Sequence, residues 1–235
     1  MNWTKTLICA AALIIGTVAW PAVVVQELPA TGQQTNLISD GNFSSGRIGA
    51  PPPKPWQCPK STEQTRVTVE TPAGRPAPER WVRLVDDSDQ ENANIRQSFA
   101  PVRSVRFQAR LISNRNGGRL FMNLGGGAAS KPEERVVQLS INSDGSLVVR
   151  GAQKSKTSMQ IKAGEMYLVR CDFEPINDGK TLRVTAELVE ESTQRSSRAE
   201  TEVETPMAIT ALRVTSLRAD TGVDYYVTDL SLTGR

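Results

Sequence analysis

The sequence predicts an all-β chain in which two antiparallel sheets pack face to face as a sandwich. From residue 65 onward, apolar residues recur at every second position in many short segments. Clusters of Gly, Asn, Asp and Pro separate these segments, and none of them carries the apolar stripe of an amphipathic helix. Strands with one apolar face must bury it, and two packed sheets are the simplest arrangement that does so.

The alternation is clearest over residues 105–111, 137–141 and 182–188. Such segments form strands with one buried and one solvated face. The first of them reads Val105, Arg106, Phe107, Gln108, Ala109, Arg110 and Leu111. Further strands are expected at 65–70, 81–85, 95–99, 118–124, 147–149, 166–173, 211–217 and 225–232. The polar segment 190–204 is expected to form a long solvated hairpin tip.

Residues 1–30 have the pattern of an export segment. Lys5 is the only charge before a long apolar run, and a small residue such as Ala19 or Ala30 is suitable for cleavage. The uncharged run 7–25 is also close to the length of a membrane-spanning helix, although Pro21 interrupts it. We therefore expect either a signal peptide or an uncleaved N-terminal membrane anchor, and a secreted, periplasmic or cell-surface location.

Residues 31–235 are sufficient for a single sandwich domain with its own core. The proline-rich residues 46–60 are expected to be an extended connector that lies across this sandwich. In an oxidising compartment, Cys58 and Cys171 are a possible disulfide. The alternative is a free buried thiol at Cys171, which lies on the apolar side of an expected strand.

The composition excludes several kinds of chemistry. The chain has no histidine, which excludes Ser-His and Cys-His nucleophiles and His-ligated zinc. The net charge is +3 and basic and acidic residues alternate, so we predict no nucleic-acid partner. The acidic tract 86–91 has no aromatic residue beside it and is interpreted as a solvated turn. We predict that the protein is not an enzyme.

A small set of side chains remains as a candidate binding surface. Strict alternation assigns Tyr226 to the core with Leu230, and it directs Tyr225 outward. Trp56 is expected to cover an edge of the core. The candidate ligand-binding residues are the outward Trp81, Arg83 and Tyr225, together with Arg106 and Arg110, which could meet an acidic glycan.

Two motifs near the ends resemble a known family. Residues 36–46, NLISDGNFSSG, resemble the opening strand of galactose-binding-like carbohydrate-binding modules, and residues 224–232, DYYVTDLSL, resemble their closing strand. The segments 80–101, 139–150 and 163–188 resemble laminin-G-like and concanavalin A-like sandwiches of secreted bacterial proteins. This resemblance covers residues 36–233 and implies a jelly-roll sandwich that binds carbohydrate.

The resemblance also bears on metal binding. Many modules of this family hold a structural calcium through a Glu after the opening Phe and the first Asp of the closing strand. Ser44 and Thr228 occupy those positions here, and alternation directs Asp229 to the face opposite Thr228. Asp40 and Asn42 are the remaining oxygen donors. We predict no cofactor, with calcium as the open alternative.

The sequence therefore predicts an exported, non-catalytic sandwich that binds a polysaccharide, a surface glycan or another cell-envelope component. One alternative is a structural or protein-interaction module of the cell surface. A third is a polysaccharide-degrading enzyme with an unrecognised site.

Overall fold

The computed structural model describes residues 35–204, 207–217 and 221–234. These residues form two antiparallel sheets. The seven-stranded sheet contains β1 Thr65–Glu70, β2 Trp81–Asp86, β4 Val105–Ser113, β9 Met166–Ile176, β10 Thr181–Glu190, β11 Arg195–Glu204 and β13 Val223–Gly234. The six-stranded sheet contains β3 Asn94–Val102, β5 Leu120–Gly125, β6 Arg135–Ile141, β7 Ser146–Arg150, β8 Lys154–Gln160 and β12 Ile209–Ser216. Two short 3₁₀ turns, Pro132–Glu134 and Asn177–Gly179, precede β6 and β10.

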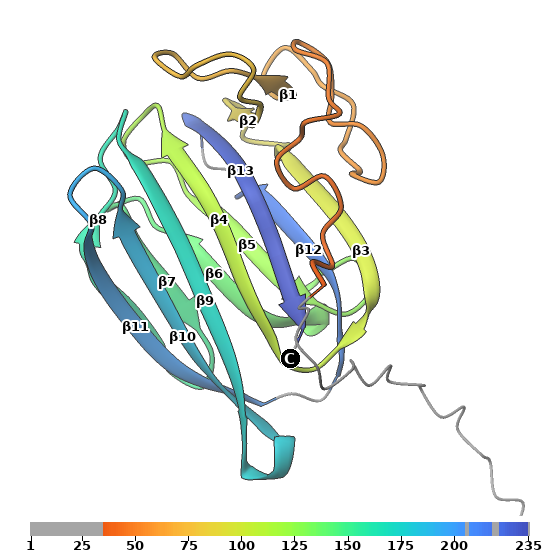
Figure 1. The fold of residues 1–235 in the computed structure, drawn as a ribbon, viewed down its shortest axis with the longest axis vertical. Helices are drawn as coiled ribbons and strands as arrows, with labels where there is room; N and C mark the ends of the chain where they lie inside the picture. Colours follow the sequence, from red (N-terminus) through yellow and green to blue (C-terminus); the bar gives the residue numbers. More distant parts are fainter. Residues whose placement is uncertain (1–34, 205–206, 218–220, 235) are drawn as a thin grey trace, which may run out of the picture.

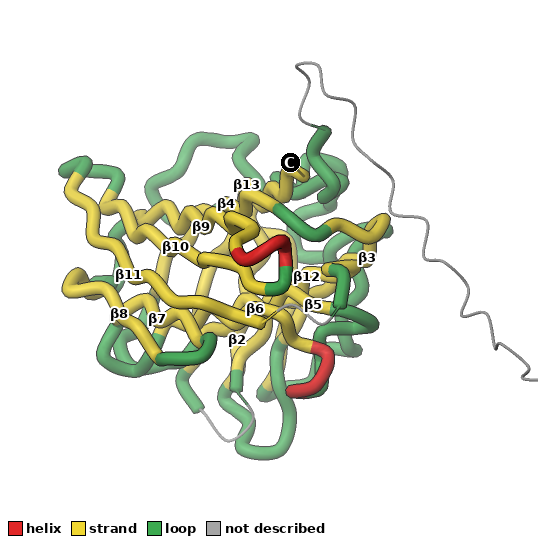
Figure 2. The backbone as a smooth tube through the Cα atoms, turned by 90° about the horizontal axis from the view of Figure 1, so that it is seen from below, coloured by secondary structure: helices red, strands yellow, loops and turns green. Residues whose placement is uncertain are grey.

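The two sheets lie face to face, which confirms the predicted sandwich (Figures 1 and 2). The strand orders are β1-β2-β13-β4-β9-β10-β11 and β3-β12-β5-β6-β7-β8. Every strand expected from alternation is present. Among the described residues, no helix has the length and apolar character needed to cross a membrane. Residues 1–30, where the export segment is predicted, lie outside this part of the chain.

The prediction of a solvated hairpin tip at 190–204 is wrong, because most of this segment is β11, and β8 was not expected at all. Both are edge strands with few inward apolar residues, such as the buried Ala199 and Val203 of β11. The two edges contact each other across the sandwich, where Ser158 Oγ lies 3.0 Å from Ser197 Oγ. These strands use polar side chains to join the sheets, so their sequences lack the alternation of a half-buried strand.

The connector of residues 46–60 crosses from one sheet to the other. The Gly49 amide donates to the Val69 carbonyl of β1 at 2.8 Å, and Gln57 exchanges two 2.9 Å backbone hydrogen bonds with Arg96 of β3. Trp56 is 3% exposed and covers the edge of the core, as predicted. The connector therefore protects two strand edges that would otherwise be open to pairing.

The two described cysteines are free, so the possible disulfide is not formed. Cys171 is buried in the core on β9 of the seven-stranded sheet. Cys58 follows Gln57, whose backbone pairs with the edge strand of the other sheet. Burial raises the pKa of both thiols, and Asp172 adds to the effect at Cys171.

Strand β13 contains a bulge between Thr228 and Ser231, where Asp229 has a φ of +49°. A bulge inserts an extra residue, so the inward-facing positions change parity across it. Val223, Tyr225 and Val227 face the core before the bulge, and Leu230 and Leu232 face it afterwards. The predicted orientations of the two tyrosines are therefore wrong: Tyr225 is 2% exposed in the main core, and Tyr226 lies on the outer face.

Candidate functional site

A polar pocket of about 370 Å³ lies over the outer face of the seven-stranded sheet. We call it the bulge pocket, because the bulged residues of β13 form part of its wall. Its lining comes from the opening loop, the 75–80 loop, four strands and the residue after β10. These residues are Asn42, Ser44, Arg75, Pro78, Glu79, Arg80, Trp81, Arg110, Met166, Glu191, Thr228 and Asp229.

The opening loop reaches the pocket because it is fixed against β13. The Leu230 amide donates to the Gly41 carbonyl at 3.0 Å, and the Leu37 amide donates to the Leu232 carbonyl at 2.7 Å. A Cβ atom at Gly41 would lie 1.9 Å from the Leu230 oxygen, so only glycine permits this approach. The first and last motifs of the domain therefore meet at one place.

The turn in the opening loop directs Phe43 into the core. Phe43 is fully buried, and its ring centroid lies 5.4 Å from that of Trp56. Asp40 supports the turn by accepting a 2.6 Å hydrogen bond from the Ser45 hydroxyl. With Phe43 buried, the flanking Asn42 and Ser44 line the bulge pocket.

Arg110 is one of three arginines that line the pocket, together with Arg75 and Arg80. Its Nε donates to Glu191 Oε1 and its Nη1 to Asp229 Oδ2, both at 2.7 Å. Partial burial acts to lower the pKa of Arg110, but the hydrogen bonds and charges of Glu191 and Asp229 outweigh this effect and raise it. Two carboxylates thus hold the guanidinium in one orientation, which leaves its remaining N–H groups as donors.

Trp81 lies beneath the pocket and is not an exposed platform. Although it is on the outer side of the sheet, as alternation predicts, it is only 2% exposed. It packs with Ile112, Tyr226 and Met166, and its indole Nε1 donates to Glu79 Oε2 at 3.3 Å. The expectation of an outward aromatic ring is therefore wrong for Trp81, because neighbouring side chains and the 75–80 loop cover it.

The other candidate ligand-binding residues, Arg83, Arg106 and Tyr225, lie outside the bulge pocket. Arg83 donates two hydrogen bonds to the buried Asp224, at 2.9 and 2.8 Å, and its guanidinium carbon lies 5.4 Å from the Tyr226 ring centroid. These contacts raise the pKa of Arg83, with the Asp224 hydrogen bond as the largest cause. Arg106 pairs with Asp172 at 2.7 Å near the opposite end of β4. Trp81 and Arg110 line the bulge pocket, whereas Arg83, Arg106 and Tyr225 do not.

The positions that carry calcium-binding carboxylates in the resembled family do meet here, as Ser44 and Thr228. Thr228 Oγ1 already donates to the Arg80 carbonyl at 3.0 Å. Asp229 lines the same pocket as Thr228, so the prediction that these residues face opposite ways is wrong, and the bulge is the reason. The described part of the chain contains no cluster of three or more His, Cys, Asp and Glu residues that could hold a metal ion.

Comparison with solved structures supports the fold. The Ca²⁺-bound exoplasmic/lumenal domain of VIP36 is similar to this chain, with a TM-score of 0.56 and 10% identity over 85% of this chain and 90% of that chain. The fold is a concanavalin A-like jelly roll. A legume lectin-like domain from Entamoeba histolytica is also similar, with a TM-score of 0.51 and 10% identity over 87% of this chain and 97% of that chain.

Enzyme structures share the same jelly roll. A conserved carbohydrate esterase from Shiga toxin-encoding bacteriophage phi24B has a TM-score of 0.55 and 12% identity over 86% of this chain and 100% of that chain. A sialidase has a TM-score of 0.52 and 12% identity over 72% of this chain, which spans only 17% of the sialidase chain. No protein-family model and no curated protein sequence matches the chain. At these identities the likeness establishes the fold and not the activity.

Proposed function

We propose that the protein is a non-catalytic glycan-binding domain and that the glycan occupies the bulge pocket. The observation that carries this proposal is the convergence of the opening loop, Arg110 and the β13 bulge on one polar pocket. The jelly roll is shared with a legume lectin-like domain and with VIP36, one structure of which is described as bound to Man3GlcNAc. The pocket volume of about 370 Å³ lies within the usual range for small-ligand sites.

The side chains of the pocket match the chemistry of a sugar. Sugar hydroxyls both donate and accept hydrogen bonds, so they need a mixed set of partners. Asn42 and Ser44 supply both kinds, Asp229 accepts, and Arg110 donates. The half-buried Met166, which packs on the covered Trp81, supplies an apolar contact for the C–H face of a ring. A sugar that binds here is held chiefly by hydrogen bonds.

The arrangement of the carboxylates supports binding without bond cleavage. Glu191 and Asp229 both accept hydrogen bonds from Arg110, and these contacts direct them toward the same cation. A glycosidase needs its two carboxyl groups free to face the scissile bond, whereas both carboxylates here already accept hydrogen bonds from one guanidinium. A Ser-His esterase mechanism is excluded because the chain has no histidine.

The export pattern of residues 1–30 supports a location where glycans are accessible. We propose that the domain is exported and acts at a cell surface or in an envelope compartment. N-terminal sequencing of the protein recovered from cell fractions tests this location. A periplasmic, surface or secreted protein is expected, and an uncleaved chain found only in the cytoplasm would overturn it.

A glycan array probed with the full chain tests the binding proposal. The chain should bind a defined set of glycans, and Arg110→Gln should weaken binding about tenfold or more, as expected when a charge-assisted hydrogen bond is lost. Arg106→Gln is the matched control, because it removes the same charge from the same strand outside the pocket. Equal loss in both variants, or release of reducing ends from a bound glycan, would refute the proposal.

A further inference from the structure

A row of polar side chains crosses the outer face of the six-stranded sheet. The strand register places these residues directly opposite one another in the order Arg96, Arg213, Asn123, Gln138 and Arg150. The row passes over β3, β12, β5, β6 and β7. Neighbouring strands lie about 4.8 Å apart, so the row extends for about 19 Å. The residues on either side of Arg213, Leu212 and Val214, belong to the core, which places the row on the opposite face.

A groove of about 370 Å³ follows this row. We call it the arginine groove. Arg119, Arg135, Arg150 and Arg213 line it together with the amides Asn123 and Gln138, and Arg96 lies opposite Arg213 on the neighbouring strand β3. Gln138 Nε2 donates to Asn123 Oδ1 at 3.0 Å, so the two amides form a continuous floor. Within the described chain, the residues that line this hollow include arginines and no Asp or Glu.

Four arginines in and beside the groove have no carboxylate partner among the described residues, namely Arg96, Arg135, Arg150 and Arg213. Arg96 Nε donates instead to Gln57 Oε1, and Arg135 Nη2 donates to the Ser130 carbonyl, both at 2.8 Å. The Nε–H groups of Arg135 and Arg213 are buried and have no hydrogen-bond partner within residues 35–204, 207–217 and 221–234. Leaving a buried donor unpaired is costly, and it is rare in native proteins. These two groups are therefore suited to donate to a bound ligand.

The local electrostatics are those of an anion site. Burial lowers the pKa of Arg213, and the charges of Arg135 and Arg96 lower it further, against a smaller opposite effect of Glu134. The carboxylate of Glu134 accepts hydrogen bonds from the Ser130 and Lys131 amides and does not pair with an arginine of the groove. An anion in the groove would relieve the repulsion among these guanidinium groups.

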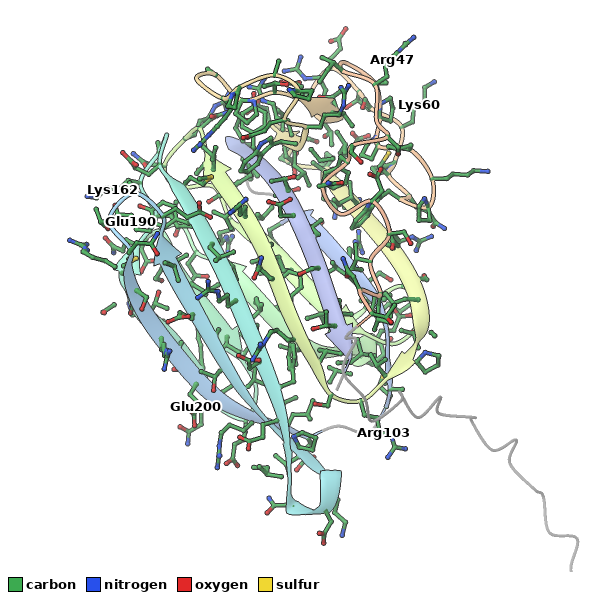
Figure 3. All side chains as sticks on the ribbon, in the orientation of Figure 1. Arg47, Lys60, Arg103, Lys162, Glu190 and Glu200 are labelled. Carbon is green, nitrogen blue, oxygen red and sulfur yellow. The ribbon has the colours of Figure 1, made fainter. Side chains whose placement is uncertain are left out.

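On the opposite face of the sandwich, several arginines form ion pairs with carboxylates. On the seven-stranded sheet, Arg198 pairs with Glu187 at 3.1 Å, and Arg183 pairs with Glu200 at 3.6 Å. Charged side chains cover this face, where Glu200 points away from the sheet (Figure 3). Its arginines neutralise neighbouring carboxylates across the strands. The groove differs from this part of the seven-stranded sheet, because Arg135, Arg150 and Arg213 have no carboxylate partner among the described residues.

We infer that the arginine groove binds a linear acidic polysaccharide. Carboxylate or sulfate groups would bind the arginines at the two ends of the row, where planar guanidinium groups offer paired donors. Sugar hydroxyls between these anions would meet the central amides Asn123 and Gln138. Single-stranded nucleic acid would require exposed aromatic rings for stacking, and Phe121, the aromatic residue that lines the groove, is only 5% exposed.

The test measures the affinity of the full chain for hexamers of polygalacturonate, hyaluronan and heparin. At least one hexamer should bind, and its carboxyl-reduced or desulfated neutral counterpart should not. Arg213→Gln and Arg150→Gln should each weaken binding about tenfold or more, and high salt should do the same. Arg150 is exposed, so its substitution leaves the fold intact.

Arg106→Gln and Arg183→Gln are the matched controls, because they remove the same charge from the opposite sheet. Both should leave the affinity within about twofold of the original. Absence of binding to all three hexamers, or equal weakening by the controls, would overturn the inference. So would a single-stranded oligonucleotide that binds more tightly through Arg213. The bulge pocket lies on the other sheet, so its failure to bind neutral glycans would not affect this result.

Discussion

At the residue scale, single positions determine where the two ends of the domain meet. Gly41 permits backbone contact with Leu230, and Phe43 anchors the opening loop in the core. The local sequence is typical of this turn, since a short Asp-Gly-Asn segment before an aromatic residue favours a tight turn. It does not predict the role of Gly41, because the atom that excludes a side chain belongs to a distant part of the chain.

Gly41→Ala should destabilise the fold. The added Cβ would lie 1.9 Å from the Leu230 oxygen, so the loop or β13 must move. We expect a loss of about 3 kcal/mol in the free energy of unfolding, measured by urea denaturation. Gly164→Ala is the control: it has a φ of +83° but open space around it, so its cost should be about 1 kcal/mol. Equal costs for the two variants would contradict the close approach at Gly41.

The two described thiols should react slowly with an alkylating reagent, and at different rates. Burial raises the pKa of both, so little thiolate is present at about pH 8. Cys58 is half-buried and should be labelled by iodoacetamide in the folded protein, faster as the pH rises. Cys171 should be labelled only after unfolding, as peptide mass mapping would show. Rapid labelling of Cys171 in the folded chain would be inconsistent with its place in the core.

At the element scale, alternation identifies the strands that have one apolar face. It correctly predicts β4 and β10 and which face of each strand is buried, because their inner residues contact only the core. It fails at β8 and β11, where polar edge strands contact each other, and at β13, where the bulge reverses the parity within one strand. That reversal is why Tyr225 and Tyr226 exchange their predicted positions.

Substitutions at Asp229 should show how much the bulge depends on its backbone conformation. Asp229 has a φ of +49°, which Asn tolerates and β-branched residues do not. We expect Asp229→Val to cost about 2 kcal/mol in the free energy of unfolding, and Asp229→Asn to cost less than about 1 kcal/mol. Thermal and urea denaturation measure both values. If Val were tolerated as well as Asn, the bulge would not be the element that shapes the pocket.

At the scale of the whole molecule, the two outer faces of the sandwich carry different chemistry. Several arginines pair with carboxylates on the seven-stranded sheet, whereas Arg135, Arg150 and Arg213, which have no ion-pair partner among the described residues, line the groove on the six-stranded sheet. The sequence does not reveal this difference between the two faces, because a net charge of +3 and dispersed basic residues suggest no basic face. The register of five strands gathers arginines that lie far apart along the chain.

The most direct test of glycan binding in the bulge pocket is a titration followed by nuclear magnetic resonance. A glycan that binds on the array would be added to the isotope-labelled chain. The account predicts that the largest shift changes occur at Asn42, Ser44 and Asp229 and at the indole N–H of Trp81, and that Arg110→Gln suppresses them. Changes confined to other surfaces, or changes that persist in Arg110→Gln, would contradict it.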